Sequence, residues 1–474
     1  METTYNYWIW GATVLKATQE IANHIQESDE IHIVTHIDAD GITAGAIAKS
    51  TLEGIRLEHS IEFVQRIDEP LLEKLRNQNK TTWFTDMGSG MISHLSGLDC
   101  IITDHHIPQK ALPLTSSRKG LYHLNPHLHG IDGTREISGA GVTYLVARAV
   151  NKKNRNLAHL AIVGAMGDGQ DSRAGYLEGV NQDILQDGKV EGSVEWHQDI
   201  RYFGRSTRPV CHLLQFADDP RLPYLSGNRS ACISFLSMLD IPLKEKNKWR
   251  RWSDLTHGEK RRIISHLIQL LISKGFGYHQ ARRIIGEVYV LIQEEEGTSL
   301  RDAKEYATLL NSTGRYEKAR VGLHICLGDR EKYLQEAKNL LMSHRRHLAK
   351  GLQLVKREIV EQEYIQFFYG GSKIKETIVG SITGMIVRSE QVRKDLPLIG
   401  LVDTDEGDIK VSARASRHLL TQGVNLSQAL RKAASVLGGQ GGGHDIAAGA
   451  TIPRGTEQEF LGLAEQEIKN QLTS

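Results

Sequence analysis

The sequence has few of the residues that define several protein classes. Only 4 of its 474 residues are cysteine, and they are scattered with no CxxC pair, at Cys100, Cys211, Cys232 and Cys326. This pattern excludes a disulfide framework and a zinc ribbon, and buried thiols are expected instead. No apolar run reaches about 18 residues, and the first twenty residues lack the basic and then apolar order of a secretory leader. We therefore expect a cytoplasmic protein with no membrane partner.

The chain also lacks an excess of charge of either sign. Its 58 lysines and arginines nearly balance 57 aspartates and glutamates, which gives a net charge of +1. Many nucleic-acid-binding proteins carry a large basic excess, but a local basic groove is enough for binding. The length exceeds what one hydrophobic core normally supports, so two or three domains are expected.

Acidic and histidine-bearing segments follow apolar runs four times in the first third of the chain. They are "THIDADG", "FTDMGSG", "ITDHHIP" and "MGDGQD". The runs at 31–36, 81–86 and 100–106 have the composition of buried parallel strands. Because ligands of an open α/β sheet collect at the carboxyl ends of its strands, we expect one polar cluster there, made of His36, Asp38, Asp40, Asp86, Asp104, His105, His106 and Asp168.

Carboxylates packed this closely repel one another, and a divalent cation removes that penalty. Carboxylate and imidazole ligands without thiolate suit Mn²⁺ or Mg²⁺ better than structural Zn²⁺. Two such ions can stabilise both oxygens of an in-line phosphoryl displacement. Asp86 is alone on a middle strand and has two oxygens, so we expect it to bridge the ions.

Each segment also has a simpler interpretation. Asp-Ala-Asp-Gly favours a surface turn, Asp86 and Asp104 could cap short helices, and the paired histidines could be ordinary loop residues. Four such segments at strand ends, in order, favour the metal site.

Alternating strand and helix patterns predict an α/β fold with a parallel sheet in residues 1–205. A mostly helical insert is expected over 206–328, where the alternation fades, and one long connecting helix over 329–364. A smaller α/β domain is expected over 365–474. Within the insert, "KWRRWSDLTHGEKRR" combines arginine with tryptophan, which suits base stacking, although an amphipathic helix explains it equally well.

The last domain carries a second polar group. The alternating strand "DIKVSARA" puts Ser412 and Arg414 on one face. The stretch "GGQGGG", which ends at Gly443, exposes backbone N–H groups and is followed by His444. Such a loop can hold an anion, although a flexible linker is the alternative.

The segments "HIDADG", "TDMGSG", "DHH" and "GDGQD" resemble the four motifs of the DHH phosphoesterases, and "GGQGGGHDIAAGA" resembles the signature of their DHH-associated domain. The strings "LPYLSGNRSACISFL" and "LLNSTGRYEKARVGLHICLGDR" are similar to archaeal RecJ-like exonucleases of the GINS-associated nuclease type. Bacterial RecJ usually has aspartate where His36 stands.

This resemblance implies metal ligands at His36, Asp38, Asp40, Asp86, His105 and Asp168. It implies catalytic roles for Asp38, Asp86 and His106, with His106 as a water-positioning residue or general acid. It also implies substrate binding by Ser412, Arg414, Gly441, Gly442, Gly443 and His444.

The resemblance further implies a two-metal exonuclease that releases mononucleotides from single-stranded DNA, and also from RNA, in replication or repair. Replisome proteins such as GINS are the implied partners of the insert. Three alternatives remain. One is a phosphodiesterase for short oligonucleotides or cyclic dinucleotides, another is a nonenzymatic replisome scaffold, and the third is an RNA-directed enzyme.

Overall fold

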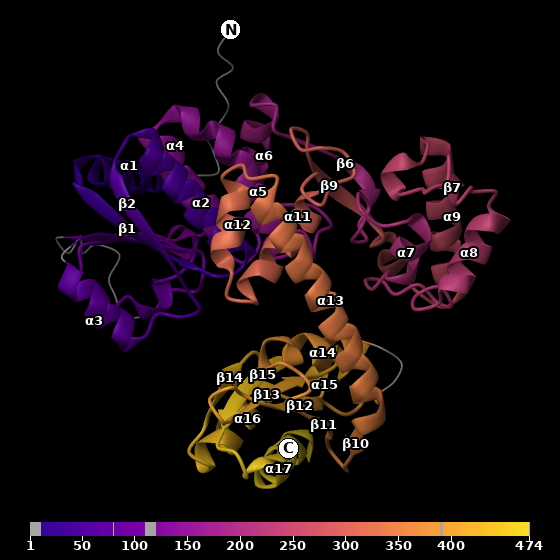
Figure 1. The fold of residues 1–474 in the computed structure, drawn as a ribbon. Helices are drawn as coiled ribbons and strands as arrows, with labels where there is room; N and C mark the ends of the chain where they lie inside the picture. The colour runs from indigo at the N-terminus through magenta and orange to yellow at the C-terminus, as the bar shows by residue number, and fades with distance from the viewer. Residues whose placement is uncertain (1–10, 79, 110–119, 389–391, 474) are drawn as a thin grey trace. The chain divides into compact units, whose positions relative to one another are not determined.

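The computed structural model describes residues 11–78, 80–109, 120–388 and 392–473. The chain divides into two compact units, the first ending at Lys338 and the second beginning at Asn339. Each unit has its own sheet and its own core (Figure 1). No helix among the described residues is both long and apolar enough to cross a membrane.

The first unit is built on a five-stranded parallel sheet in the order β2-β1-β3-β4-β5. The strands are β1 (Glu30–His36), β2 (Glu58–Val64), β3 (Thr81–Thr85), β4 (Cys100–Thr103) and β5 (Leu121–Leu124). The central strands β3 and β4 are buried along their whole length, as their runs of β-branched and aromatic residues predict. The predicted α/β class with a parallel sheet is confirmed.

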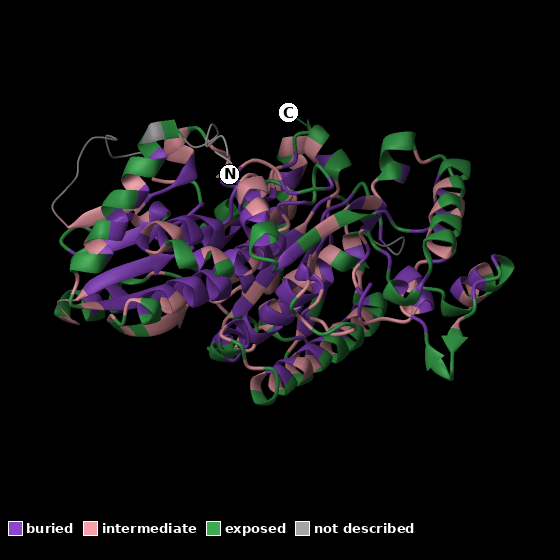
Figure 2. Ribbon diagram, turned by 90° about the horizontal axis from the view of Figure 1, so that it is seen from above, coloured by how far each residue is buried: buried purple, intermediate pink, exposed green. Residues whose placement is uncertain are grey.

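Helices cover both faces of this sheet. On one face lie α2 (Ala39–Gly54) and α4 (Gly139–Val150), with α1 (Gly11–Glu27) and α5 (Ala158–Gly167) packed beside them. On the other face, α3 (Glu69–Gln78) and the segment that follows the short helix η1 (Ser89–Met91) pack against alternate strand residues such as Val34, Phe84 and Ile102. Figure 2 shows the buried sheet between exposed helix faces.

The chain then passes through α6 (Val180–Val190) into β6 (Val194–Ile200), which pairs antiparallel with β9 (Ile285–Leu291). This two-stranded sheet was not predicted. Between its strands lies a mainly helical core that includes α7 (Val210–Gln215), α8 (Arg229–Met238), α9 (His257–Ser273) and α10 (Tyr278–Arg282), with the short hairpin β7 (Lys244–Glu245) and β8 (Lys248–Trp249).

Two later helices return to the first sheet. The helices α11 (Ala303–Gly314) and α12 (Ala319–Cys326) pack on α2, and α11 also packs on α5. The backbone N–H of Ala39 donates to Asn311 Oδ1 at 2.9 Å, so α11 contacts the start of α2 directly. We propose that the insert ends before α11; the other predicted domain boundaries stay predictions.

The connecting helix α13 (Lys332–Glu358) is shorter than the predicted 329–364. Asp329 accepts the backbone N–H groups of Glu331, Tyr333 and Leu334 through Oδ1, which fixes the start of the helix. At the other end the chain leaves the helix to form β10 (Val360–Glu361). The boundary between the two units falls within this helix.

The second unit has a mixed six-stranded sheet in the order β10-β11-β12-β13-β15-β14. Its further strands are β11 (Gln366–Gly371), β12 (Leu398–Asp403), β13 (Ile409–Arg414), β14 (Gln440–Gly443) and β15 (Ala447–Ile452). One face packs on α14 (Glu376–Arg388) and the other on α16 (Leu426–Val436) and α17 (Glu457–Thr473), with α15 (Arg417–Thr421) contributing Leu419 to the second core.

The glycine stretch of this unit is not the loop that the sequence predicted. Residues 440–443 form the edge strand β14, which pairs with β15. A Cβ at Gly441 would come within 2.8 Å of the Leu430 carbonyl oxygen. Glycine is therefore required because this strand lies directly against the backbone of α16.

Candidate metal centre

The first group of site residues lies where β1 meets α2. Asp38 is the N-cap of α2 and accepts the Gly41 backbone N–H through Oδ1 at 3.0 Å. Its other oxygen, Oδ2, lies 2.9 Å from Nδ1 of His36, the last residue of β1. Burial works against protonation of His36, but the Asp38 carboxylate outweighs it and raises the pKa of the imidazole. The alternative prediction for this segment was a surface turn; in the structure Asp38 instead begins helix α2.

Asp40 lies in the first turn of α2 and is completely enclosed. Its carboxylate accepts the backbone N–H groups of Gly139 at 2.7 Å and Ala140 at 2.9 Å, at the amino terminus of α4. A helix amino terminus favours a negative charge. Burial and the neighbouring Asp168 nevertheless raise the pKa of Asp40.

Asp86 follows β3 and has a left-handed backbone with a φ of 60°. A non-glycine residue in this region is strained, and such strain persists where the surrounding structure holds it in place. The Asp86 backbone N–H donates to Thr103 O at 2.8 Å, and the side chain is almost fully buried. Burial, followed by the charge of Asp40, raises the pKa of Asp86 well above its usual range.

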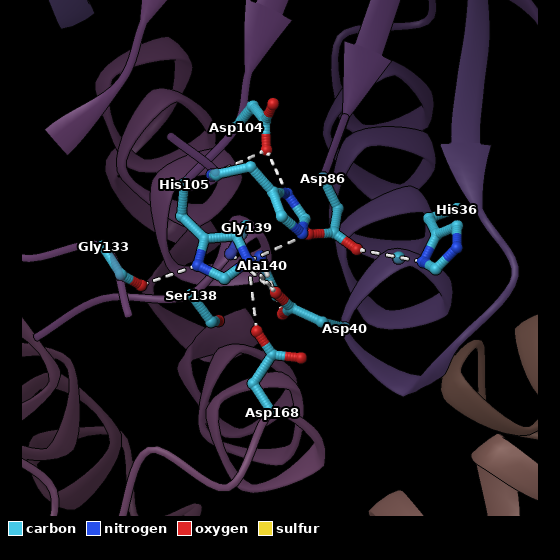
Figure 3. Close-up of polar contacts among 12 residues, drawn as sticks. His36, Asp40, Asp86, Asp104, His105, Gly133, Ser138, Gly139, Ala140 and Asp168 are labelled. Atoms are coloured by element: carbon cyan, nitrogen blue, oxygen red, sulfur yellow. Dashed lines mark hydrogen bonds and ion pairs between the residues drawn. The ribbon is translucent and has the colours of Figure 1, made fainter. Parts of the chain in front are cut away.

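His105 faces three carboxylates. Its Nδ1 donates to the Gly133 carbonyl at 2.6 Å, so the tautomer leaves Nε2 toward the acidic residues. Nε2 lies 3.1 Å from Asp168 Oδ2, 3.4 Å from Asp86 Oδ1 and 3.7 Å from Asp40 Oδ2. Figure 3 shows these four side chains pointing toward one another, with His36 on the far side of Asp86.

Asp168 reaches the cluster from an element that the sequence did not predict. The run before it is the helix α5 and not a strand, and Asp168 is its C-cap. The hypothesis that all four segments follow strand ends is therefore wrong for the fourth. A carboxylate at a helix carboxyl terminus is unfavourable for the helix dipole, so the helix itself gives no reason for aspartate here.

His106 and Asp104 form a pair at the rim. The His106 Nδ1 donates to Asp104 Oδ1 at 2.8 Å, and this hydrogen bond raises the pKa of His106. Asp104 is buried and also accepts the Ser89 backbone N–H at 2.8 Å. The His106 ring is exposed, so the pair leaves its Nε2 accessible while Asp104 fixes its orientation.

The donor atoms of these residues group in three overlapping sets. They are His36 with Asp38 and Asp86, Asp40 with His105 and Asp168, and Asp86 with His105 and His106. Asp86 Oδ1 and His105 Nε2 are buried without a hydrogen-bond partner, as is His36 Nδ1. Raised carboxylate pKa values and unsatisfied buried donor atoms fit divalent cations with oxygen and nitrogen ligands.

The structure thus brings together all six residues predicted as metal ligands, and His106 beside them. Their roles as ligands and catalysts stay predictions. Asp86 belongs to two of the three sets, which is the position that the predicted bridging ligand would need.

Sequence reasoning missed several residues that shape this site. A Cβ at Gly139 would collide with the Asp86 carboxylate, and one at Gly164 with that of Asp40. The "SGAG" segment did carry a signal, because small residues ahead of an apolar helix allow close backbone approach. Ser138, left off the predicted site, caps α4 by accepting the Gly141 N–H at 3.2 Å and does not enter the acidic cluster.

Two arginines around the site were also missed. Arg315, just after α11, lies close enough for Asp38 to influence its pKa, although burial is the larger effect and lowers it. Arg201 follows β6, and its Nη2 donates to the Asp171 carbonyl at 2.9 Å and to the Asp171 carboxylate. Arg201 therefore holds the loop that carries Asp168.

The second unit holds the residues predicted to bind substrate. Arg414 Nη1 donates to Ser412 Oγ at 3.2 Å on the face covered by α14, which confirms that they share a face. Burial and the neighbouring Arg388 lower the pKa of Arg414, and no carboxylate of the described residues lies within 4 Å of it. His444 and Gly443 line an open groove with side chains of α16.

Comparison with known proteins agrees with this architecture. The DHH-CID domain model matches residues 202–285, and the DHHA1 domain model matches residues 364–470. An uncharacterized protein of Methanocaldococcus jannaschii is 32% identical over 468 residues, which cover 97% of each chain.

Solved structures share the fold at low identity. RecJ from Thermus thermophilus in complex with Mn²⁺ is 17% identical, with a TM-score of 0.57 over 96% of this chain. The chain spans 55% of the length of that RecJ. An exonuclease RecJ bound to manganese gives a TM-score of 0.59 at 16% identity, covering 96% of this chain and 94% of that one. CDC45 from Entamoeba histolytica gives 0.68 at 12% identity, covering 96% and 99%.

The two matched domains, the full-length relative and the shared fold, together with the acidic motifs at the sheet edge, lead to one conclusion. The chain belongs to the RecJ-like DHH family.

Proposed function

We propose that this protein is a metal-dependent exonuclease that hydrolyses single-stranded nucleic acid to mononucleotides. The observation that carries the proposal is the cluster of buried carboxylates and imidazoles whose donor atoms lie within 4.8 Å of one another in three overlapping sets. RecJ structures of the same fold were determined with Mn²⁺ and with Mg²⁺, which supports these ions as the cofactors.

In this proposal, His36, Asp38 and Asp86 would hold one ion, and Asp40, His105 and Asp168 would hold the other. When bound, such ions neutralise charge at the scissile phosphate and make water a stronger nucleophile. The α4 amino terminus orients Asp40, and the Gly133 carbonyl orients His105, so the ligands need little rearrangement.

His106 is the proposed proton donor to the leaving oxygen. Its Nδ1 is held by Asp104, and its exposed ring leaves Nε2 for the substrate. The raised pKa of His106 keeps more of the imidazole protonated near neutral pH, as a general acid requires.

Phosphate binding is proposed for Ser412, Arg414, the glycines of β14 and His444. The Arg414 guanidinium lies beside Arg388 with no carboxylate of the described chain within 4 Å, so an anion would relieve the repulsion. DNA and RNA are both included in the proposal, because the phosphate groups that these residues would bind are the same in both. Action in the cytoplasm, in replication or repair with replisome partners such as GINS, is part of the same proposal.

Digestion of end-labelled single-stranded DNA and RNA in Mn²⁺ tests the proposal, with products resolved by size. We expect mononucleotides from the intact chain, none from Asp86→Ala, and normal release from Asp218→Ala, which replaces an exposed aspartate. Equal activity in the Asp86 variant would reject the site. Cleavage of dinucleotides but not of long strands would favour the short-oligonucleotide alternative.

A nonenzymatic scaffold is the second candidate, because the CDC45 structure has a higher TM-score than either RecJ structure named above. All six proposed ligand positions hold competent side chains in one place, which favours the enzyme. A chain that binds no Mn²⁺ and releases no nucleotide, while it still folds, would favour the scaffold.

A further inference from the structure

The charge of this chain is unevenly distributed. The DHH-CID region, residues 202–285, contains fifteen lysines and arginines against six aspartates and glutamates, a net charge of +9. The remaining 390 residues carry a net charge of −8, which hides this region in the overall value of +1. A local basic surface of this size attracts polyanions.

Some of these cationic side chains lie over exposed aromatic rings. The guanidinium of Arg208 lies 4.9 Å from the centroid of the Phe216 ring, and that ring is 55% exposed. Phe216 is also in edge contact with the ring of His212, at 6.3 Å between centroids. The Arg208–Phe216 contact joins the turn before α7 to the end of that helix.

A second ring continues the same surface. The Trp249 side chain of the β7–β8 hairpin is 38% exposed, with Lys244 Nζ at 4.8 Å and the Arg229 guanidinium at 5.7 Å from its ring centroid. Both strands of this hairpin are exposed (Figure 2).

The two groups lie on neighbouring elements. His212 is on α7, Phe216 is its C-cap, Arg229 begins α8, and α7 packs on α8. Burial lowers the pKa of His212, and the charges of Arg229 and Arg208 lower it further. We name these residues together the aromatic–cation ladder. Its members are Arg208, His212, Phe216, Arg229, Lys244 and Trp249.

Three of the six acidic residues of the region pair with other cations. Glu259 pairs with Arg250, Asp254 with Arg251, and Asp219 with Arg283. The structure describes every residue of 202–285. Among the residues that it describes, no carboxylate lies within 4 Å of the Arg229 or Lys244 side-chain nitrogens. These two cations are therefore available for an external anion.

The other tryptophan of the "KWRRW" segment does not belong to this surface. Trp252 is fully buried and donates from Nε1 to Asp199 at 2.8 Å, and Arg250 is held by Glu259. Arg250 and Trp252 therefore hold the fold of this region together. Only its first tryptophan can meet a ligand.

We propose that the aromatic–cation ladder is an auxiliary binding surface for single-stranded nucleic acid, separate from the metal centre. Phosphates would lie against Arg229 and Lys244, and bases would stack on Trp249 and Phe216. An acidic protein would need the cations but not the exposed rings. The inference extends the proposed function by giving long strands a second point of attachment.

Fluorescence anisotropy of the full chain with a labelled oligonucleotide of about 20 nucleotides tests this inference. The buffer contains EDTA, so binding is measured without cleavage. Trp249→Ala should weaken binding about ten-fold, the size of one lost base stack. The double variant Arg229→Ala/Lys244→Ala should reduce the slope of log K against log salt by about 1.4, for two lost phosphate contacts.

Tyr278→Ala is the matched control, since Tyr278 is 63% exposed in the same region and its ring contact is with His279. It should bind as the unaltered chain does. Unchanged binding in both ladder variants would overturn the inference. A second result would also overturn it. If only the double variant loses binding, and if polyglutamate displaces the labelled oligonucleotide as well as an unlabelled oligonucleotide does, the surface would be assigned to an acidic protein.

The two proposals fail separately. A chain that binds the oligonucleotide through the ladder but never cleaves it would retain this inference and reject the nuclease. A chain that cleaves in Mn²⁺ but binds equally well without Trp249, Arg229 and Lys244 would do the reverse.

Discussion

Two groups of buried carboxylates in the first unit differ in the charged side chains beside them. One includes Asp199, and the other includes Asp40 and Asp86. Asp199, at the base of the DHH-CID region, accepts the Trp252 N–H and has Lys260 at 3.2 Å and Arg205 at 3.3 Å. Burial raises its pKa, but the hydrogen bond from His197, followed by the charges of Arg205 and Lys260, lowers it further than burial raises it. Asp40 and Asp86 have raised pKa values. Asp199 thus has cations of the same chain beside it, whereas the proposal for the sheet edge is that its cations are bound metal ions.

The largest effect should come from Asp86→Asn. This change removes a shared ligand, so Mn²⁺-dependent nucleotide release should fall on the order of 1,000-fold, since the loss of several kcal/mol of transition-state stabilisation has that size. Without metal the variant should melt no lower than the unaltered chain, because it loses a buried charge. Parallel melting curves in EDTA and in Mn²⁺ check both statements. A variant that unfolds in EDTA would mean that Asp86 is structural.

Arg205→Met breaks the paired cluster instead. Arg205 Nη1 donates to Asp302 at 3.0 Å and Nη2 to Asp199 at 3.3 Å, and all three side chains are buried. Removing one partner of a buried ion pair costs about 3 kcal/mol of unfolding free energy. Denaturant unfolding should show this loss, and Mn²⁺ should not restore it. Arg221→Met, at an exposed arginine, is the control. Full recovery in Mn²⁺ would erase the distinction between the clusters.

Arg201→Gln should have a smaller effect, on metal affinity. Arg201 holds Asp171, three residues after Asp168, so its loss should loosen that ligand and weaken Mn²⁺ binding about 10–100-fold. Calorimetric titration measures the affinity directly. Arg173→Gln, on the exposed side of the same loop, should bind Mn²⁺ normally. Equal affinity in both variants would show that the loop needs no support from β6.

The smallest effect concerns pH. Burial, followed by the charge of Asp302, raises the pKa of Glu305 from 4.5 to about 7. The folded state therefore binds more protons than the unfolded state between these values, and this contribution to stability is lost as pH rises from about 4.5 through 7. Glu305→Gln should remove this loss. The difference between the unfolding free energies at pH 5 and pH 8 should therefore be smaller in the variant than in the unaltered chain, by on the order of 1 kcal/mol. Equal pH dependence of the two proteins would contradict the raised pKa.

The sequence predicted the sheet edge because its signals are local. Runs such as "TTWFTD" identify both the strand and the residue that follows it, and parallel strands end at one edge. Asp168 was assigned to the right place from the wrong element, because a short apolar run such as "LAHLAIVGAM" fits a buried helix as well as a strand. Gly139 and Arg201 act through contacts with residues far away in the chain, which periodicity does not reveal.

Contacts between distant residues also decide the structure of the glycine stretch in the second unit. Glycine in "GGQGGG" permits either a loop or a strand, and only the packing against α16 decides for β14. For "KWRRW" the sequence could not tell which tryptophan is buried, because Trp252 is fixed by Asp199 on another element. In contrast, the alternation of strand residues was enough to predict that Ser412 and Arg414 share one face, where their side chains form a hydrogen bond.

Anomalous diffraction from crystals soaked in Mn²⁺ tests the central claim most directly. The account predicts two peaks in the first unit, one beside His36 and Asp38 and one beside Asp40 and His105, with the Asp86 carboxylate between them, and no peak at Asp199 and Asp302. The absence of both peaks, in crystals where Mn²⁺ reaches other surface carboxylates, would contradict the account.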